Sequence, residues 1–353
     1  YPGYSSRIQA ADFSPDGSKV YAVQEDGHMQ VYDADTGAWV ERFPETDDAL
    51  YRTAYSSDGQ WVATANYSDG YDILLWNRSA PDSPTVLSGH PEVVDSMAFS
   101  PSGDRLLSVD WDRISRWKQT GILWNTTTGE ALYTLDLSEG GWHIHEVRFT
   151  PDGTRFAVAY SYRVELFWTE TGQRIQTFEW DLEDDIYSMA FSPDGTLLAT
   201  EEGYDFTVVR LWDDATGKFL RILTRGDARV GKMEFSPDGD SLLASEAKYE
   251  DGAGFATLYE IETGDPVRSY QWETGATQFF AQEVAFSPDQ SKVLTSNLDG
   301  RIVVWESGLE PITEPVPTAT PAPNPSPTAR PVEEVTEPLR EFGLGSVSAV
   351  DLS

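Results

Sequence analysis

The sequence predicts an all-β fold made of seven similar four-stranded units that stack around a common axis. Two observations predict it. A five-residue turn motif of the FSPDG type recurs seven times, and the aromatic residues that begin the copies lie 42 to 51 residues apart. A second aromatic column follows each copy, and in five copies a glycine stands five residues after it. A period of this length indicates one repeated supersecondary unit rather than unrelated domains.

The turn motif predicts the first two strands of each unit. In the motif, proline fixes φ, the aspartate side chain accepts hydrogen bonds from the turn backbone, and glycine takes the position with positive φ. Apolar segments flank every copy, so we expect an inner strand before the turn and a second strand after it. The copies begin at Phe13, Tyr55, Phe99, Phe149, Phe191, Phe235 and Phe286.

The second aromatic column predicts the third strand, and the segment after the downstream glycine predicts an outer fourth strand. Four short strands cannot bury both of their faces alone, so the units must pack face to face in a ring. The members of this column are Tyr32, Trp76, Trp124, Phe167, Trp212, Tyr259 and Trp305.

Seven units of about 44 residues resemble the WD-repeat (tryptophan–aspartate) family of seven-bladed β-propellers, in a degenerate bacterial form. The resemblance covers roughly residues 7–306. The family's aspartate after the aromatic is present only at Asp33 and Asp213. Its Gly-His pair is present only at Gly89-His90. The other blades are therefore expected to depend on aromatic contacts between neighbouring sheets.

In the third blade, the resemblance implies the family's buried hydrogen-bond network. Its expected members are His90, Ser108, Asp112 and Trp124.

The end of the chain departs from the repeat pattern. A stretch rich in proline and threonine favours an extended chain without a core. After it, EPLREF resembles an outer strand and SVSAVDLS resembles an inner strand. We therefore expect a propeller at 1–307, a linker at 308–336 and a C-terminal strand segment at 337–353.

The seventh unit lacks an outer strand of its own, and three arrangements of the C-terminal segment are open. The segment closes its own seventh blade, it is donated to a neighbouring copy in a head-to-tail polymer, or the chain continues into a second propeller. An extended linker of this length spans about 90 Å, which is long enough for donation. The residues expected to make these contacts are Leu339, Phe342, Val347, Val350 and Leu352.

No catalytic, cofactor or metal-binding motif is recognised, so the chain is predicted not to be an enzyme. His143 and His145 alternate at the start of a strand, but two histidines without a third ligand are more typical of a polar loop than of a metal site. A metal-assisted enzyme is kept only as the weakest of three hypotheses.

Propellers commonly bind partners at the rim where the inner strands begin. By repeat alignment, the position four residues before each motif aromatic lies there. Tyr51 and Tyr187 are the most plausible anchors, since tyrosine combines a large area with a polar tip. The alternative is that these side chains line a water-filled channel. The candidate interaction residues at this position are Tyr51, Asp95, His145, Tyr187 and Gln282.

The net charge and composition limit the classes of partner and the cellular location that we expect. Twenty-five basic and 59 acidic residues give a formal net charge of −34, which disfavours nucleic-acid binding and anionic membranes. The chain has no cysteine and no apolar run long enough for membrane insertion. Acidity, absence of cysteine and the Pro/Thr-rich linker fit a secreted prokaryotic protein, extracellular or at the cell surface.

The leading functional hypothesis is a non-catalytic structural scaffold that associates with itself through its C-terminal strands. The alternative is a recognition module that binds a protein, peptide or glycan on the rim.

Overall fold

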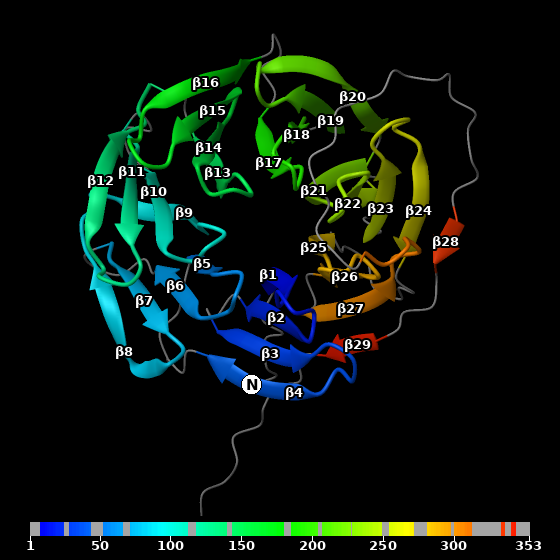
Figure 1. The fold of residues 1–353 in the computed structure, drawn as a ribbon, viewed down its shortest axis with the longest axis horizontal. Coiled ribbons are helices and arrows are strands. Elements are labelled where there is room, and N and C mark those ends of the chain that lie inside the picture. The colour runs from blue at the N-terminus through cyan, green and yellow to red at the C-terminus, as the bar shows by residue number, and fades with distance from the viewer. Residues whose placement is uncertain are drawn as a thin grey trace, which may run out of the picture.

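The described residues of the computed structural model form a closed ring of seven β-sheets, or blades, which confirms the predicted fold class (Figure 1). The structure describes residues 8–24, 28–43, 52–65, 71–111, 118–139, 143–179, 185–203, 207–226, 228–248, 254–271, 281–297, 300–312, 333–335 and 340–343.

Blades one to four each contain four consecutive antiparallel strands, the first innermost and the fourth outermost. They are β1 (Ile8–Phe13), β2 (Lys19–Gln24), β3 (Met29–Asp33) and β4 (Trp39–Phe43); β5 (Arg52–Tyr55), β6 (Trp61–Ala65), β7 (Ile73–Asn77) and β8 (Ala80–Leu87); β9 (Val93–Phe99), β10 (Arg105–Trp111), β11 (Thr120–Asn125) and β12 (Ala131–Asp136); and β13 (Ile144–Phe149), β14 (Arg155–Tyr160), β15 (Arg163–Trp168) and β16 (Arg174–Glu179).

Blades five to seven continue the ring, and the last two include strands from the far end of the chain. They are β17 (Ile186–Phe191), β18 (Leu197–Glu202), β19 (Thr207–Asp213) and β20 (Lys218–Gly226); β21 (Ala228–Phe235), β22 (Ser241–Lys248), β23 (Gly254–Glu260), β24 (Pro266–Gln271) and β28 (Glu333–Val335); and β25 (Ala281–Phe286), β26 (Lys292–Asn297), β27 (Arg301–Glu306) and β29 (Arg340–Gly343).

The turn chemistry follows the sequence prediction. In blade one, the hydroxyl of Ser14 donates to Asp16 Oδ1 at 2.6 Å, and the Ser18 amide donates to the same oxygen at 3.0 Å. Gly17 has φ of 68°, so the motif glycine occupies the left-handed region. The seventh copy has Gln290 there, with φ of 53°. Its side chain contacts Asp238 in blade six and the Glu310 carbonyl after blade seven.

Aromatic side chains join neighbouring blades, as predicted. Tyr21 and Tyr55 meet edge to face across blades one and two, with ring centroids 6.1 Å apart. Phe178 and Trp212 do the same across blades four and five, at 6.1 Å. The ring is closed between its two ends because Ile8 of β1 belongs to one apolar cluster with residues of blade seven.

The predicted histidine network of blade three is present with one different member. His90 Nε2 lies 2.6 Å from Ser108 Oγ, which also accepts the indole N–H of Trp124 at 2.8 Å. The carboxylate beside His90 Nδ1 belongs to Asp110, at 3.1 Å, and not to Asp112, which lies outside the described residues. Asp110 lies two residues after Ser108 in β10, so the alternation of the strand places both side chains on the side of His90.

The described tail residues lie along the outer edges of the last two blades (Figure 1). β29 pairs antiparallel with β27, from Arg301↔Gly343 to Val304↔Arg340, so blade seven obtains its fourth strand from its own chain. β28 lies inside the predicted linker and pairs parallel with β24. Of the predicted tail contacts, Phe342 is in β29, opposite Ile302. Leu339, Val347, Val350 and Leu352 lie outside the described residues.

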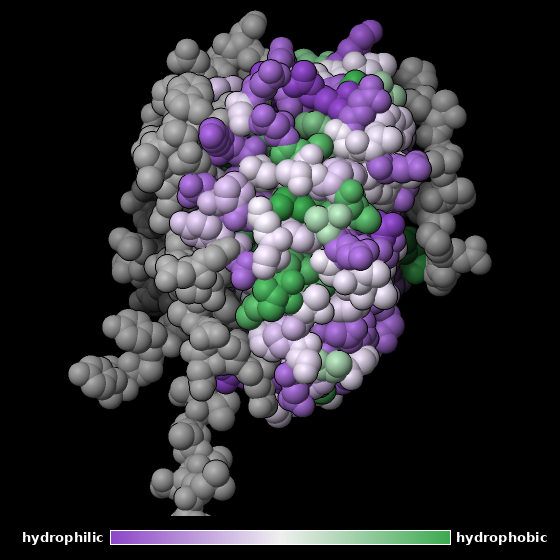
Figure 2. Space-filling model, turned by 90° about the vertical axis from the view of Figure 1, so that its left-hand side faces the viewer, coloured by the Kyte–Doolittle hydropathy of each residue, from purple (hydrophilic) through white to green (hydrophobic). Residues whose placement is uncertain are grey.

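The outer surface is mostly hydrophilic, with small hydrophobic areas. Figure 2 shows this pattern on the side that carries the blades at the left of Figure 1. Exposed apolar side chains recur on outer strands, including Val86 in β8, Leu132 in β12 and Ile175 in β16. None of the described residues belongs to a helix that could cross a bilayer.

Candidate functional site

Six of the seven inner strands carry a β-bulge close to their first residue. In β13, Ile144 pairs with Tyr160 and Glu146 with Ala159, so His145 between them has no partner opposite. A bulge turns the extra residue out of the regular alternation and re-aims its side chain. The bulges contain the positions that the repeat alignment selected: Gln9, Asp95, His145, Tyr187, Gly231 and Gln282.

Three predicted site residues from adjacent blades meet in one group, which we call the rim cluster. Asp95, His145 and Tyr187 come from blades three, four and five. Gln282 lies in the distant blade seven, and Tyr51 lies outside the described residues. The rim cluster consists of Arg52, Asp95, Trp111, His143, His145, Asp185 and Tyr187.

Asp95 joins three blades at one end of the rim cluster. Its Oδ1 accepts from the Arg52 guanidinium at 2.8 Å, and its Oδ2 lies 3.1 Å from His143 Nε2. The Asp95 side chain is 7% exposed. Burial alone raises a carboxyl pKa, but His143 and Arg52 outweigh it and hold the pKa of Asp95 at about 2. The carboxylate is therefore an ionised, fixed acceptor.

A row of aromatic rings crosses the middle of the rim cluster. Ring centroids are 4.7 Å apart for Trp111 and His143, 4.4 Å for His143 and His145, and 5.1 Å for His145 and Tyr187. All three pairs meet edge to face, the arrangement that ring quadrupoles favour. The two histidines also place their Nδ1 atoms 3.2 Å apart.

Asp185 and Tyr187 form the other end of the rim cluster. The Tyr187 hydroxyl donates to Asp185 Oδ2 at 3.2 Å, and Asp185 Oδ1 lies 3.7 Å from His145 Nε2. Burial and the charge of His143 lower the pKa of His145 to about 4, against the opposing effect of Asp185 and Asp95. His145 is therefore neutral at pH 7.

The rim cluster has a buried centre and accessible ends. The His145 side chain is 14% exposed, whereas Asp185 is 37% and Arg52 is 40% exposed. A partner at this surface would meet a cation, a carboxylate and a tyrosine whose positions are already set by neighbours. Such an arrangement suits recognition more than chemistry, since it holds no nucleophile paired with a base.

A second charged group lines the central channel. The ammonium of Lys232 in blade six lies 2.9 Å from Glu146 Oε1 in blade four, a contact between non-adjacent blades that only the middle of the ring allows. Arg148 contacts the same oxygen at 3.0 Å. Water reaches the channel, because the Lys232 and Arg148 side chains are 34% and 35% exposed. The residues one and three places before the motif aromatics thus supply these charges, and one of them, Lys232, lies in the bulge of its strand.

The channel carboxyls differ in how they are compensated. Burial would raise the pKa of Glu146, but Lys232 and Arg148 hold it at about 2. Burial raises the pKa of Glu283 to about 8, and the charges of Glu146 and Asp12 add to this effect while Lys232 and Arg148 oppose it. Burial also raises the pKa of Asp12 to about 6, against the Phe13 amide and Arg148. The two cations thus compensate Glu146 more fully than Glu283 or Asp12.

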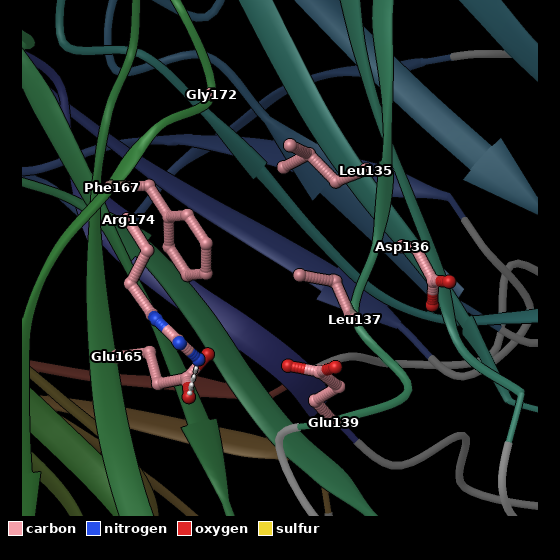
Figure 3. Close-up of a pocket in the computed structure, with 8 residues that line it drawn as sticks. All are labelled: Leu135, Asp136, Leu137, Glu139, Glu165, Phe167, Gly172 and Arg174. Carbon is pink, nitrogen blue, oxygen red and sulfur yellow. Dashed lines mark hydrogen bonds and ion pairs between the residues drawn. The ribbon is translucent and has the colours of Figure 1, made fainter.

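A cavity of about 220 Å³ lies between blades three and four, away from the rim cluster (Figure 3). Leu135 and Leu137 line one side of the cavity, and Phe167 faces them from blade four. An ion pair between Arg174 Nη1 and Glu165 Oε1, at 2.8 Å, lies on the same side as Phe167. Paired charges beside an apolar wall do not indicate a reaction.

Metal binding was not predicted, and among the described residues no group of three or more histidine, cysteine, aspartate or glutamate side chains converges as ligands. His143 precedes β13 and His145 is its bulge residue, so the expected alternation along a strand does not apply. Sequence reasoning missed Arg52, Trp111 and Asp185. Their positions relative to the inner strands carry no repeat signal.

The structure defines a seven-bladed β-propeller. Three segments match the family described as WD domain, G-beta repeat: residues 82–116, 172–213 and 277–306. The predicted resemblance to the WD-repeat propellers is therefore confirmed in these segments.

Full-length similarity to curated proteins agrees with this. A guanine nucleotide-binding protein subunit beta of Arabidopsis thaliana is 24% identical over 323 residues, covering 87% of this chain and 82% of the relative. A serine-threonine kinase receptor-associated protein of Dictyostelium discoideum is 21% identical, covering 86% and 97%. Eukaryotic translation initiation factor 3 subunit I of Neosartorya fischeri is 32% identical over 123 residues, covering 35% of each chain.

Proposed function

We propose that this chain is a non-catalytic interaction scaffold that binds a protein partner through the rim cluster. The observation that carries the proposal is the row of rings from Trp111 to Tyr187, flanked by Arg52 and Asp185. Aromatic and arginine side chains dominate binding energy in protein interfaces when their surroundings hold them in place. Here the bulges and the ion pairs hold them.

The names of the relatives support a protein partner. One is named as a subunit of a guanine nucleotide-binding protein and another as receptor-associated, so both names describe association with other proteins. A net charge of −34 favours encounter with a partner that presents a basic segment. The accessible carboxylate of Asp185 offers such a segment a contact point.

The test compares variants at the two ends of the rim cluster with a matched surface control. Arg52→Ala combined with Tyr187→Ala should weaken binding of a partner captured by the wild type at least 30-fold, since each lost anchor costs about 1–2 kcal/mol. Trp39→Ala on outer strand β4 removes a side chain that is 57% exposed and should change nothing. Isothermal titration calorimetry measures the affinity.

Equal binding by the double variant and the wild type would show that the partner uses another face. The melting temperature of Trp39→Ala should move little. That of the double variant should fall, because Arg52 compensates the buried Asp95 carboxylate, so binding is compared at a temperature where both variants are folded.

A second candidate function is self-assembly in an extracellular setting, and the C-terminal strands favour it. β29 contacts its blade through the backbone pairs Arg301↔Gly343 to Val304↔Arg340. A second copy's residues 340–343 would make the same pairs, and a contact that does not close on itself gives linear polymers. The location is inferred from composition, and detection of the protein in the culture medium of its host would test it.

Sedimentation velocity distinguishes a tail that pairs with its own blade from a tail that pairs with a neighbouring copy. The full chain should form oligomers whose size grows with concentration, and a chain without residues 313–353 should stay monomeric. This deletion keeps Ile312, whose amide donates to the Asp289 carbonyl at 3.1 Å. A full chain that is monomeric up to millimolar concentration would contradict self-assembly and leave the rim proposal intact.

A further inference from the structure

We propose that the Nδ1 atoms of His143 and His145 together bind a divalent transition-metal ion of the zinc, copper or nickel type, with water completing its coordination. The observation behind the proposal is the separation of 3.2 Å between the two Nδ1 atoms.

The partner of His143 fixes which of its nitrogens is free. Nε2 lies 3.1 Å from Asp95 Oδ2, and the Asp95 carboxylate is also bound by the Arg52 guanidinium. A carboxylate only accepts hydrogen bonds, so His143 Nε2 carries the proton. In the neutral ring, His143 Nδ1 then carries a lone pair that can bind a metal ion.

The surroundings of His145 Nε2 are looser. It lies 3.7 Å from Asp185 Oδ1 and 3.5 Å from Ser161 Oγ, a hydroxyl that can donate as well as accept, so the His145 proton is free to occupy either ring nitrogen. Without a metal ion, His145 Nδ1–H can donate to His143 Nδ1 across the 3.2 Å contact. With the proton on His145 Nε2, both Nδ1 lone pairs face the same point, and a metal ion takes the place of the shared proton.

The spacing fits a metal ion. Imidazole nitrogens bind zinc at about 2.0–2.1 Å, so two of them 3.2 Å apart subtend an angle of about 100° at the ion, which is near tetrahedral. The bulge at His145 makes this spacing possible for residues two apart, because it breaks the alternation that would otherwise set the register.

The surroundings select the class of ion. Two imidazoles suit zinc, copper and nickel, whereas calcium and magnesium require several oxygen ligands. A carboxylate on the remote nitrogen of a metal-binding histidine is a common second layer that orients the ring and raises its basicity. Asp95 supplies this for His143 at 3.1 Å, whereas Asp185 lies 3.7 Å from His145 Nε2, beyond a direct hydrogen bond.

This inference goes beyond the proposed partner binding and does not depend on it. The protein alone contains both ligands, so a partner is unnecessary for the test.

The experiment is a titration of the purified full chain, stripped with a chelator, with Zn²⁺ at pH 8 in 0.15 M salt, followed by calorimetry. We expect one ion per chain. His145→Ala should weaken Zn²⁺ binding at least 100-fold, and Asp95→Asn should weaken it 10- to 100-fold by freeing the His143 ring. Trp39→Ala removes an exposed side chain on outer strand β4, outside the rim cluster, so it should bind Zn²⁺ as the wild type does. Co²⁺ absorption should report nitrogen coordination.

Weak binding that is the same in the wild type and in His145→Ala would assign the ions to the acidic surface and overturn the proposal. Absence of a Co²⁺ spectrum would overturn it as well, and would leave a proton shared between the rings. Circular dichroism shows that each variant is folded. Because Asp95→Asn retains both ligands, its intermediate affinity separates a metal site from a folding defect.

Discussion

Blades three and seven both contain four antiparallel strands, but they obtain the fourth strand and the partner of the buried tryptophan differently. In blade three, β12 follows β11 after a short turn. In blade seven, residues 307–339 separate β27 from β29. By the length dependence of loop closure, the longer connection costs about 2 kcal/mol more.

The buried tryptophans also have different partners. Trp124 donates to Ser108, which continues to His90 and Asp110. Trp305 donates to Thr295 Oγ1 at 2.9 Å, as Trp76 and Trp212 donate to threonines in blades two and five. The histidine network is therefore a feature of blade three and does not follow from the order of the strands. Both tryptophans are buried to the same degree, so the comparison teaches that a blade can be completed from a distant segment without loss of packing.

The largest expected effect tests the polar connection. Ser108→Ala leaves the Trp124 indole N–H and His90 Nε2 without their partner, and should lower the free energy of unfolding by about 2–4 kcal/mol. Thr295→Val in blade seven leaves one buried donor and should cost about 1–2 kcal/mol. Urea denaturation measures both. Equal losses in the two variants would remove the distinction between the blades.

A smaller effect concerns pH. Glu283 lies in β25 of blade seven, three residues before its motif aromatic, where blade three has Ser96. The pKa of Glu283 is raised to about 8, so between about pH 4.5 and 8 the folded state keeps a proton that the unfolded chain releases. The stabilisation that protonated Glu283 contributes is complete at low pH and is lost as the pH rises through 8.

Between pH 5 and 8 we expect Glu283→Gln to reduce the loss of unfolding free energy by about 1–2 kcal/mol. This figure is reduced for the water in the channel. Thermal unfolding at pH 5 to 8 measures it, and Ser96→Ala serves as the matched control. Glu246, whose burial raises its pKa to about 7, contributes a slope of the same sign that both variants retain. A wild type that becomes more stable from pH 5 to 8 would contradict the assignment.

The sequence was sufficient for the features that local chemistry determines. The turn motifs and the glycines after the second aromatic require particular backbone angles, and Gly37 and Gly129 have φ of 71° and 72°. The position four residues before each motif aromatic was selected by repeat alignment alone. In six of the seven inner strands it lies in a bulge. Local spacing thus predicted the blades and part of the rim.

Contacts between blades were not predictable in the same way. Arg52 meets Asp95 because the first residues of β5 and β9 approach each other, and no residue in either strand indicates that approach. Whether Asp110 or Asp112 lies beside His90 depends on the register of β10, which the residue types do not show. β28 was not predicted, because composition indicates only how flexible an isolated segment is. It does not show that the outer edge of β24 is available for pairing.

The bulges have a consequence for how such a ring changes over generations. In six of the seven inner strands the bulge residue adds no pair to the β-ladder, so the ladder itself tolerates its replacement while the rim surface changes. The buried Asp95 and the contact between His145 and Tyr187 couple neighbouring positions, so new binding preferences arise there by changing several residues together.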